Sequence, residues 1–395
     1  MPTSVSIIIL NHNGQQYLRR CFDALFLQSH REFEIIFIDN ASTDGSIAFL
    51  EQSYPDAIRH KRLRIIRNMQ NQGFAQGNNT GWRVARGELV VLLNNDTKPH
   101  RDWLRHLVES MRQHPEIMAC GSAYYDTGRK SEWEELFLKR SVGMTMNLSG
   151  EAVMCARETL GDPALIRAFF VSGNGVMLRK AQFERPFFAP YFAYAEDTYL
   201  GWLIQIRGGE VAYHLDARME HLGGGTKRIS SSAFRDELLF HGSKNQLMNP
   251  LLFYRWWTLA RVTPLLILTQ LGHLADNPRK ILIKCRAHWW VLTHLPTVLR
   301  ERKRVQRMRH RGDRAVVGRM SSVFFDPAYA STHYNRFYQR AIIALNTLSR
   351  WYCRVVLLPA QGDATLVHGP GRRAGAVRSR QANTRTGARS RRRAR

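Results

Sequence analysis

The first 120 residues alternate between short apolar runs, which are typical of buried β-strands, and segments with helical periodicity. An order of strand, helix and strand predicts a parallel sheet with helices on both faces. The expected strands are Val5–Leu10, Phe33–Ile38, Leu63–Ile66 and Glu88–Leu93. Helices are expected over residues 17–26, over 47–50 after a cap at Ser42–Thr43–Asp44, and over 77–84.

The remainder of the chain is less regular. Residues 124–168 show weak periodicity and are expected to form loops and short elements, whereas residues 171–214 resume with a strand, an aromatic cluster, a helix from Glu196 and a strand at Glu210–His214. Residues 234–314 are predicted to be mainly helical. These changes place the expected boundaries at 1–230 for an α/β domain, 231–315 for a basic helical region, 316–359 for a helical extension and 360–395 for a disordered Arg-rich tail.

Positive charge is concentrated in two stretches. The chain has 58 Lys and Arg against 32 Asp and Glu, a net charge of +26. Twelve of the basic residues lie in 279–314 and ten arginines lie in 366–395. The sequence shows no secretory signal, and its longest uncharged apolar run, Val262–Gly272, is eleven residues and too short to span a bilayer. The five cysteines form no CxxC pair, which favours reduced thiols in the cytoplasm.

Polar clusters follow three of the predicted strands. They are Asn11–His12–Asn13–Gly14, Asp39–Asn40–Ala41–Ser42–Thr43–Asp44–Gly45 and Asn94–Asn95–Asp96–Thr97. In open α/β sheets, ligands bind outside the carboxyl ends of the strands. A carboxylate there suits a ribose hydroxyl or a base N–H, although the first two clusters are also compatible with simple turns.

Asp96 is the sharper candidate because it follows a buried apolar strand. A carboxylate oxygen is a hard ligand suited to Mg²⁺ or Mn²⁺, and such a cation could bridge the phosphates of a nucleotide. The alternative is that Asp96–Thr97 caps the helix that contains Trp103 and Leu107.

Seven short sequence blocks follow one another along the chain. They are SIIILNHNG (6–14), IDNASTDGS (38–46), NQGFAQGNNTG (71–81), LLNNDT (92–97), SGNGVMLRK (172–180), YAEDTYLGW (194–202) and HLGGGT (221–226). In this order they resemble the inverting, family 2 nucleotide-sugar glycosyltransferases, in particular the rhamnosyltransferase-like branch that builds bacterial surface polysaccharides. The resemblance covers about residues 4–230, and more loosely 234–310.

The resemblance implies a GT-A-like α/β fold with a mainly parallel sheet, followed by a helical basic C-terminal module. Asp39 would contact the nucleotide base, and Asn94 with Asp96 would form the DXD-type motif with Asp96 on the metal. The first position of that motif is Asn here rather than Asp, which removes one charge. The residues expected at the nucleotide sugar are Asn11, Asn13, Asp39, Asn40, Asn71, Gly73, Asn78, Asn94, Asn95 and Asp96.

Glu196 and Asp197 follow an aromatic stretch at the start of a predicted helix. The helix dipole favours the carboxylate form, whereas aromatic walls desolvate it. A partly desolvated carboxylate is a plausible general base, and the resemblance implies that Asp197 deprotonates the acceptor hydroxyl. A solvated acidic pair at a helix start is the alternative.

Two further features have functional and structural interpretations. The glycines at 73, 77 and 81 do not have the GxGxxG spacing of a dinucleotide site, and either bring backbone N–H groups and Asn78 to a ligand or allow close helix packing.

His221 precedes a glycine loop. By resemblance it would ligate the metal or touch the diphosphate, whereas a lone histidine is more often structural.

The helical region alternates aromatic residues with Arg and Lys. Phe253, Tyr254, Trp256, Trp257, Trp289 and Trp290 are the aromatic residues of this pattern. Such a pattern suits an anionic membrane surface, and a subdomain with solvated charges is the alternative. No Gln-x-x-Arg-Trp motif of processive synthases occurs, which favours addition of one or a few sugars.

The sequence therefore predicts a metal-dependent inverting glycosyltransferase, peripheral on the inner face of the cell membrane. It would move a sugar from dTDP-rhamnose or a UDP-sugar to a lipid-linked or polysaccharide acceptor in cell-envelope glycan synthesis. Two other classes stay open: a catalytically silent nucleotide- or glycan-binding protein on the same fold, and a polyanion-binding protein. The Arg-rich tail has no stacking aromatics, so specific nucleic-acid recognition is not expected.

Overall fold

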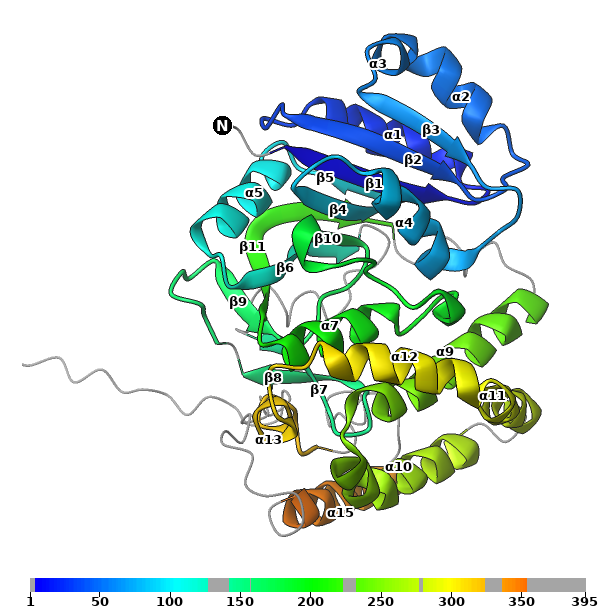
Figure 1. Ribbon diagram of the computed structural model, residues 1–395, viewed down its shortest axis with the longest axis vertical. Coiled ribbons are helices and arrows are strands. Elements are labelled where there is room, and N and C mark those ends of the chain that lie inside the picture. The colour runs from blue at the N-terminus through cyan, green and yellow to red at the C-terminus, as the bar shows by residue number, and fades with distance from the viewer. Residues whose placement is uncertain are drawn as a thin grey trace, which may run out of the picture.

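The computed structural model describes residues 4–126, 142–156, 158–222, 232–276, 280–323 and 336–353. Figure 1 shows a twisted sheet with helices on both sides and, below it, a layer of helices formed by the second half of the chain. The expected disordered tail and the glycine loop after His221 lie outside the described residues.

The N-terminal half of the sheet has the expected parallel order. Its strands are β1 (Val5–Asn11), β2 (Phe33–Asp39), β3 (Leu63–Arg67) and β4 (Leu89–Asn94), arranged β3-β2-β1-β4. Asn11 pairs in register with Asp39, and Leu10 with Asn94, so that the carboxyl ends of these strands meet at one edge. The predicted strands are confirmed to within a residue or two.

Alternate residues of these strands face opposite layers. Ile8, Ile36 and Leu92 belong to one buried cluster, in which α4 (Gly73–Val84) and α7 (Glu196–Arg207) also lie, and Ile7, Ile35 and Val91 belong to the other. The second layer contains α1 (Gln15–Phe26), α2 (Ser46–Ser53) and α5 (Trp103–Gln113). A short helix, α3 (Pro55–Arg59), leads into β3. Continuous apolar strands are therefore explained by burial on both faces of the sheet.

The rest of the sheet mixes directions, which the sequence did not predict. The order continues as β10-β6-β11-β5, with β10 antiparallel to β4 and β9 paired with β11. The strands are β5 (Thr97–Pro99), β6 (Ile117–Asp126), β9 (Leu165–Ala168), β10 (Gly175–Arg179) and β11 (Glu210–His221). A separate hairpin consists of β7 (Val142–Met146) and β8 (Ala152–Ala156). The segment 124–168, expected to form loops and short elements, therefore contributes several short strands.

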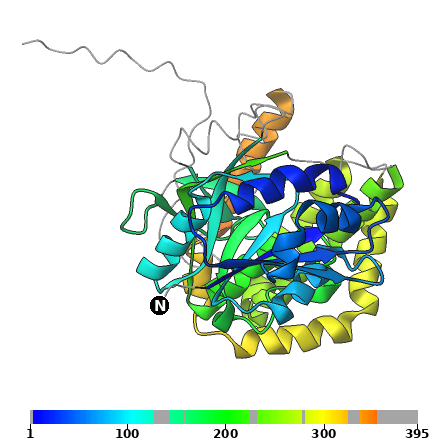
Figure 2. The same cartoon turned by 90° about the horizontal axis from the view of Figure 1, so that it is seen from above.

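The second half of the chain is helical, as predicted. Its helices are α9 (Ser232–Phe253), α10 (Trp256–Asp276), α11 (Ile281–Thr293), α12 (Leu295–Arg307), α13 (Asp313–Val317) and α15 (Arg336–Tyr352). Helix α9 packs against α7, α11 and α12, so the helical layer is joined directly to the sheet layers (Figure 2). Within the described residues, none of the helices combines the length and hydrophobicity needed to cross a bilayer.

Two parts of the aromatic and basic pattern were misinterpreted from the sequence. Phe253 and Tyr254 are buried in the core and do not lie at a surface. Several basic residues of the 279–314 stretch are used internally: Arg302 and Arg309 donate to carbonyls at the end of α9, and Arg309 pairs with Asp313 at 2.7 Å. Their guanidinium N–H groups therefore bind carbonyl oxygens of the last helical turn, which have no partner within the helix itself.

The glycines of α4 allow this helix to approach β1 closely. A Cβ atom at Gly81 would lie 2.6 Å from Ile8 Cγ2, and one at Gly77 would lie 2.5 Å from a Leu10 methyl group. Close packing, which was one of the two interpretations of this glycine block, is therefore what Gly77 and Gly81 provide.

We predict that Gly81→Ala lowers the free energy of unfolding by about 1–3 kcal/mol, because the new methyl group overpacks the interface with β1. Gly242→Ala is the matched control. It also lies inside a helix, but its Cβ would meet the nearest atom at an ordinary 3.8 Å. Urea unfolding of both variants checks the prediction, and equal midpoints would contradict it.

Candidate active site

A cavity of about 680 Å³ opens at the carboxyl ends of β1, β2 and β4. Of the thirteen residues that the sequence analysis expects at the site, ten line this cavity. They are Asn13, Asn40, Asn71, Gly73, Asn94, Asn95, Asp96, Glu196, Asp197 and His221. The register of the parallel strands brings the first three polar clusters together, as expected. Helix α7 supplies the two acidic residues from the opposite side of the cavity.

Asp96 and His221 are adjacent, although 125 positions separate them in the sequence. His221 Nε2 lies 3.2 Å from Asp96 Oδ1, and both side chains are largely buried. The cause is the antiparallel pairing of β11 with β5, which places His221 opposite Thr97. Asp96 is no helix cap, because α5 begins only at Trp103 and its N-cap position is Asp102.

Asp96 and His221 are a suitable pair of protein ligands for a divalent cation whose other ligands come from a bound substrate. Mg²⁺ is usually held by one or two carboxylates together with substrate phosphates, rather than by a complete protein cage. The described residues contain no group of three or more His, Cys, Asp or Glu side chains able to hold a metal by themselves. The imidazole nitrogen beside the carboxylate is a second donor, of a type that several divalent transition metals accept.

Asn40 connects the end of β2 to the loop before α4. Its amide donates to Asn71 Oδ1 at 2.7 Å, and its carbonyl oxygen accepts from Asn68 and from the backbone N–H of Gln72, each at 3.0 Å. Asn71 in turn accepts from the N–H of Gly73 at 2.9 Å. This network fixes the cavity wall before any ligand binds.

Three of the expected residues lie behind the cavity wall. Asn11 is buried and donates to Ser42 and Ser46. Asn78 was expected near the ligand, but its amide donates to Phe74 O one turn back in α4, so this expectation is corrected. Asp39 is also buried, with Oδ2 accepting from the N–H of Ser42 and Oδ1 accepting no hydrogen bond from the described residues.

Glu196 and Asp197 open α7, as predicted, and their carboxyl groups are desolvated. Burial raises the pKa of both groups, and the neighbouring Asp197 raises the pKa of Glu196 further. The N–H of Thr198, which donates to Asp197 Oδ1 at 2.7 Å, opposes the rise in the pKa of Asp197. Glu196 Oε2 is buried and accepts no hydrogen bond within the described part of the chain. Of the two, Asp197 is therefore the stronger candidate for an ionised base.

The loop before this pair has an unusual backbone. Phe192, Tyr194 and Ala195 all have positive φ angles, of 59°, 65° and 58°, which are unfavourable for residues other than glycine. Asn245 of α9 holds the loop, since its amide donates to the carbonyl oxygens of Tyr191, Ala193 and Tyr194 at 2.6–2.9 Å. Sequence reasoning missed Asn245, and no motif in the sequence marks it.

Asn249, one turn further along α9, fixes the start of α7. It donates to Thr198 Oγ1 at 2.9 Å and accepts from the Tyr191 hydroxyl at 2.6 Å. The helical region therefore positions the acidic pair as directly as the sheet does.

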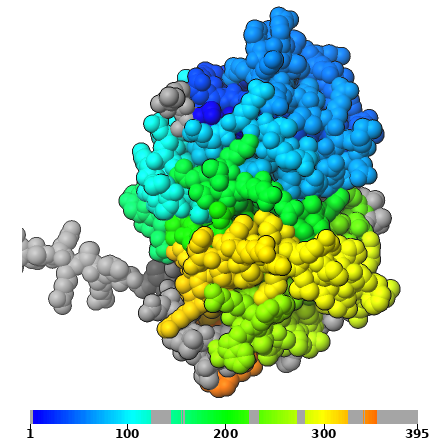
Figure 3. Space-filling view, viewed as in Figure 1, coloured from blue at the N-terminus to red at the C-terminus, as the bar shows by residue number. Residues whose placement is uncertain are grey.

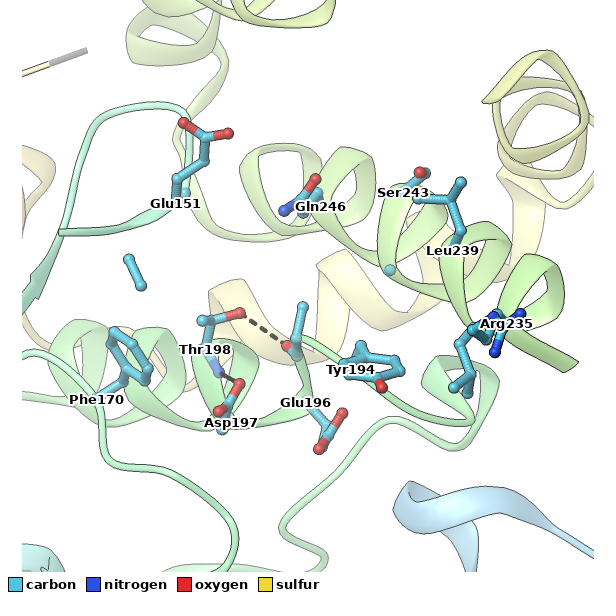
Figure 4. A pocket seen from close by; sticks show the side chains of 15 residues that line it. Glu151, Phe170, Tyr194, Glu196, Asp197, Thr198, Arg235, Leu239, Ser243 and Gln246 are labelled. Carbon is cyan, nitrogen blue, oxygen red and sulfur yellow. Dashed lines mark hydrogen bonds between the residues drawn. The ribbon is translucent and has the colours of Figure 1, made fainter. Parts of the chain in front are cut away.

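A second cavity, of about 600 Å³, adjoins the acidic pair, and Figure 4 shows the side chains that line it. It shares Tyr194, Glu196, Asp197 and Leu238 with the first cavity. Its other walls come from α9 and from the turn between β7 and β8, and include Glu151, Phe170, Arg235, Ser243 and Gln246. Two compartments thus meet at one pair of carboxyl groups.

Comparison with known proteins agrees with the resemblance seen in the sequence motifs. Residues 6–183 match the family described as glycosyl transferase family 2. The rhamnosyltransferase-like branch stays a prediction.

Individual relatives match about a quarter to a third of the chain. It is 37% identical over 110 residues to an uncharacterised glycosyltransferase of Nostoc sp., covering 27% of this chain and 32% of that protein. It is 25% identical over 158 residues to the glycosyltransferase AglE of Haloferax volcanii, covering 36% of this chain and 51% of that protein. The matched segment spans a third to a half of these relatives.

Solved structures support the fold. The structure of GalNAc-T7 with UDP, GalNAc and Mn²⁺ superimposes with a TM-score of 0.52 at 15% identity, over 67% of this chain and 51% of that chain. The expected GT-A-like α/β fold, followed by a helical region, is confirmed.

We predict that Glu196→Gln stabilises the protein more at pH 8 than at pH 5. The pKa of Glu196 is higher in the folded than in the unfolded chain, so stability is lost as the pH rises above the ordinary range of a glutamic acid, and a neutral glutamine avoids this loss. Urea unfolding at both pH values tests it, with the exposed Glu51→Gln as control. Equal effects of Glu196→Gln at the two pH values would show that the carboxyl group is not desolvated.

We further predict that Asn245→Ala lowers the free energy of unfolding by about 1–3 kcal/mol, because three loop carbonyls lose a buried donor. Gln246→Ala, at the neighbouring and less buried position of α9, should change it by less than about 0.5 kcal/mol. Calorimetry or urea unfolding measures both. If the two variants were equally stable, Asn245 would not hold the loop.

Proposed function

We propose that this protein is a metal-dependent inverting glycosyltransferase that transfers one sugar from a nucleotide-diphosphate donor to an acceptor hydroxyl. The observation that carries the proposal is that Asp96 and Asp197 line the same cavity, while a second cavity meets the first at Asp197. A donor and an acceptor can then approach one carboxylate from two sides. The family assignment of residues 6–183 supports the same reaction class.

The donor occupies the cavity at the carboxyl ends of the strands. Asn13, Asn40 and Asn71 line this cavity and are the residues that we propose to bind the nucleoside. Asp39 is buried behind them, and its Oδ1, which accepts no hydrogen bond from the described residues, is suited to a base N–H. Asp96 and His221 would hold Mg²⁺ or Mn²⁺ beside the diphosphate. Such a cation neutralises the charge that develops on the leaving diphosphate. GalNAc-T7, whose fold is similar, was solved with UDP and Mn²⁺.

The acceptor occupies the second cavity. Its hydroxyl group gives its proton to Asp197 while its oxygen forms a bond to the anomeric carbon. The bond from that carbon to the diphosphate oxygen breaks, and the nucleoside diphosphate leaves with the electron pair. Attack and departure occur on opposite faces of the sugar, so the anomeric configuration inverts in a single displacement.

The substrates that we propose come from the resemblance of the sequence motifs. dTDP-rhamnose and UDP-sugars are the proposed donors, and a lipid-linked or polysaccharide intermediate of the cell envelope is the proposed acceptor. Phe170 and Tyr194 offer aromatic faces to a sugar ring, and Arg235 offers a cation at the wall of the second cavity. We place the reaction at the inner face of the cell membrane.

Asp197→Asn and Asp96→Ala should each lower the rate of transfer by at least about 100-fold, because the first removes the base and the second a cation ligand. The assay is release of nucleoside diphosphate from a panel of nucleotide sugars with Mn²⁺ or Mg²⁺, with lipid-linked and polysaccharide acceptors. Asp56→Asn, an exposed carboxylate on α3 outside both cavities, is the control for loss of charge.

The rate of the unaltered protein should rise with pH above the ordinary range of an aspartic acid, because burial raises the pKa of Asp197. Full activity in Asp197→Asn would refute its role as the base. No turnover of any donor, with nucleotide binding retained, would instead identify a silent binding protein.

A further inference from the structure

Helix α10 is apolar on its outer as well as its inner side. Leu259, Val262 and Leu265 are buried in the core. On the outer side, Trp257 is 71% exposed, Ile267 55% and Leu271 57%. Ala260 and Pro264 complete this outer stripe at helical spacing. A helix that is apolar on all sides is normally covered, so water is an unfavourable environment for this face.

Helix α15 adds a second apolar face beside the first. Ile343, Leu348 and Trp351 are each more than half exposed. The Tyr352 hydroxyl donates to Arg261 O at 2.7 Å, which joins the two helices. Both helices lie at the end of the molecule farthest from β3 along its longest axis, as Figures 1 and 3 show. We name the exposed apolar residues of α10 and α15, with Trp256, the terminal face.

The charge of the surrounding region is strongly positive. Residues 4–126 contain 14 Lys and Arg against 13 Asp and Glu. The described residues from 232 to 353 contain 19 against 5, a net charge of +14. At the terminal face, Arg261 lies 4.9 Å from the ring centre of Trp257. The ring of Trp256 covers the buried Arg302, whose guanidinium group is already used inside the protein. Arg255 and Arg340 are exposed on the same two-helix unit.

We propose that the terminal face docks on an anionic lipid bilayer, with α10 lying parallel to the surface in the headgroup region. Tryptophan beside arginine is suited to the boundary between acyl chains and headgroups, and the flanking cations attract anionic lipids. Helix α10 does not span the bilayer, in keeping with its Pro264 and Arg261. A second copy of the chain is the less suitable occupant, because the same cations would then face each other.

This inference goes beyond sugar transfer and does not depend on it. The terminal face includes no residue of either cavity, so docking and catalysis fail separately. If the protein docks as proposed, the active site is brought to the surface where a lipid-linked acceptor would be presented.

The test is sedimentation of the full chain with vesicles of phosphatidylcholine alone and of phosphatidylcholine with one quarter phosphatidylglycerol. We expect binding to the anionic vesicles, weakened by added salt, and little binding to the neutral ones. The double variant Trp257→Gln/Leu271→Gln should lower the partition coefficient by at least about tenfold. Ile343→Gln/Trp351→Gln on α15 is an independent second variant and should act in the same direction.

Leu27→Gln is the control, because Leu27 is a 66% exposed leucine on the opposite part of the molecule and should not affect binding. Equal sedimentation of both double variants and the unaltered protein would overturn the proposal, as would failure of the unaltered protein to bind anionic vesicles. Light scattering of the lipid-free protein measures whether the terminal face instead binds a second copy of the chain. A dimer that both double variants dissociate would assign the terminal face to a second copy instead of to lipid.

Discussion

Three unfavourable backbone conformations precede the acidic pair, and the contact between α9 and this loop maintains them. A positive φ angle costs a residue other than glycine roughly 1–2 kcal/mol, and the loop has three in four positions. One amide group, that of Asn245, satisfies three of its carbonyl oxygens. The position of Asp197 is therefore set by a helix that begins after the segment matched by the family model.

Much of the positive charge of the chain has a structural use. Glu301 is buried between Arg185 and Arg304, and accepts from the Tyr199 hydroxyl at 2.6 Å. These donors hold the pKa of Glu301 below its ordinary value in spite of burial. A buried carboxylate of this kind is tolerated because it is fully paired, and it connects α12 to α7. Only the cations left at the surface are available to attract a partner.

The sequence was sufficient for the parts of the fold that depend on local pattern. Buried strands such as β1 and β2, and the helix that starts at Glu196, have a periodicity that a single sequence reveals. The mixed half of the sheet is different, since the pairing of β11 with β5 depends on contacts over more than 100 residues. For the same reason the motifs indicated Asp96 and His221 separately, whereas their contact at 3.2 Å is visible only in three dimensions. Asn78 and Asn245 are opposite cases. Asn78 lies inside a motif, but its side chain binds the backbone of its own helix. Asn245 lies outside every motif, yet its side chain holds the loop before the acidic pair.

The dependence of the loop at residues 191–198 on α9 has a consequence for protein engineering. Since α9 forms a wall of the second cavity and also fixes residues 191–198, the proposed acceptor site and the proposed base belong to one structural unit. A chimera that exchanges only the segment after residue 231 with that of a related glycosyltransferase would separate Asn245 from the loop whose carbonyl oxygens it binds. Modular exchange in this scaffold therefore has to transfer residues 189–198 together with the helix.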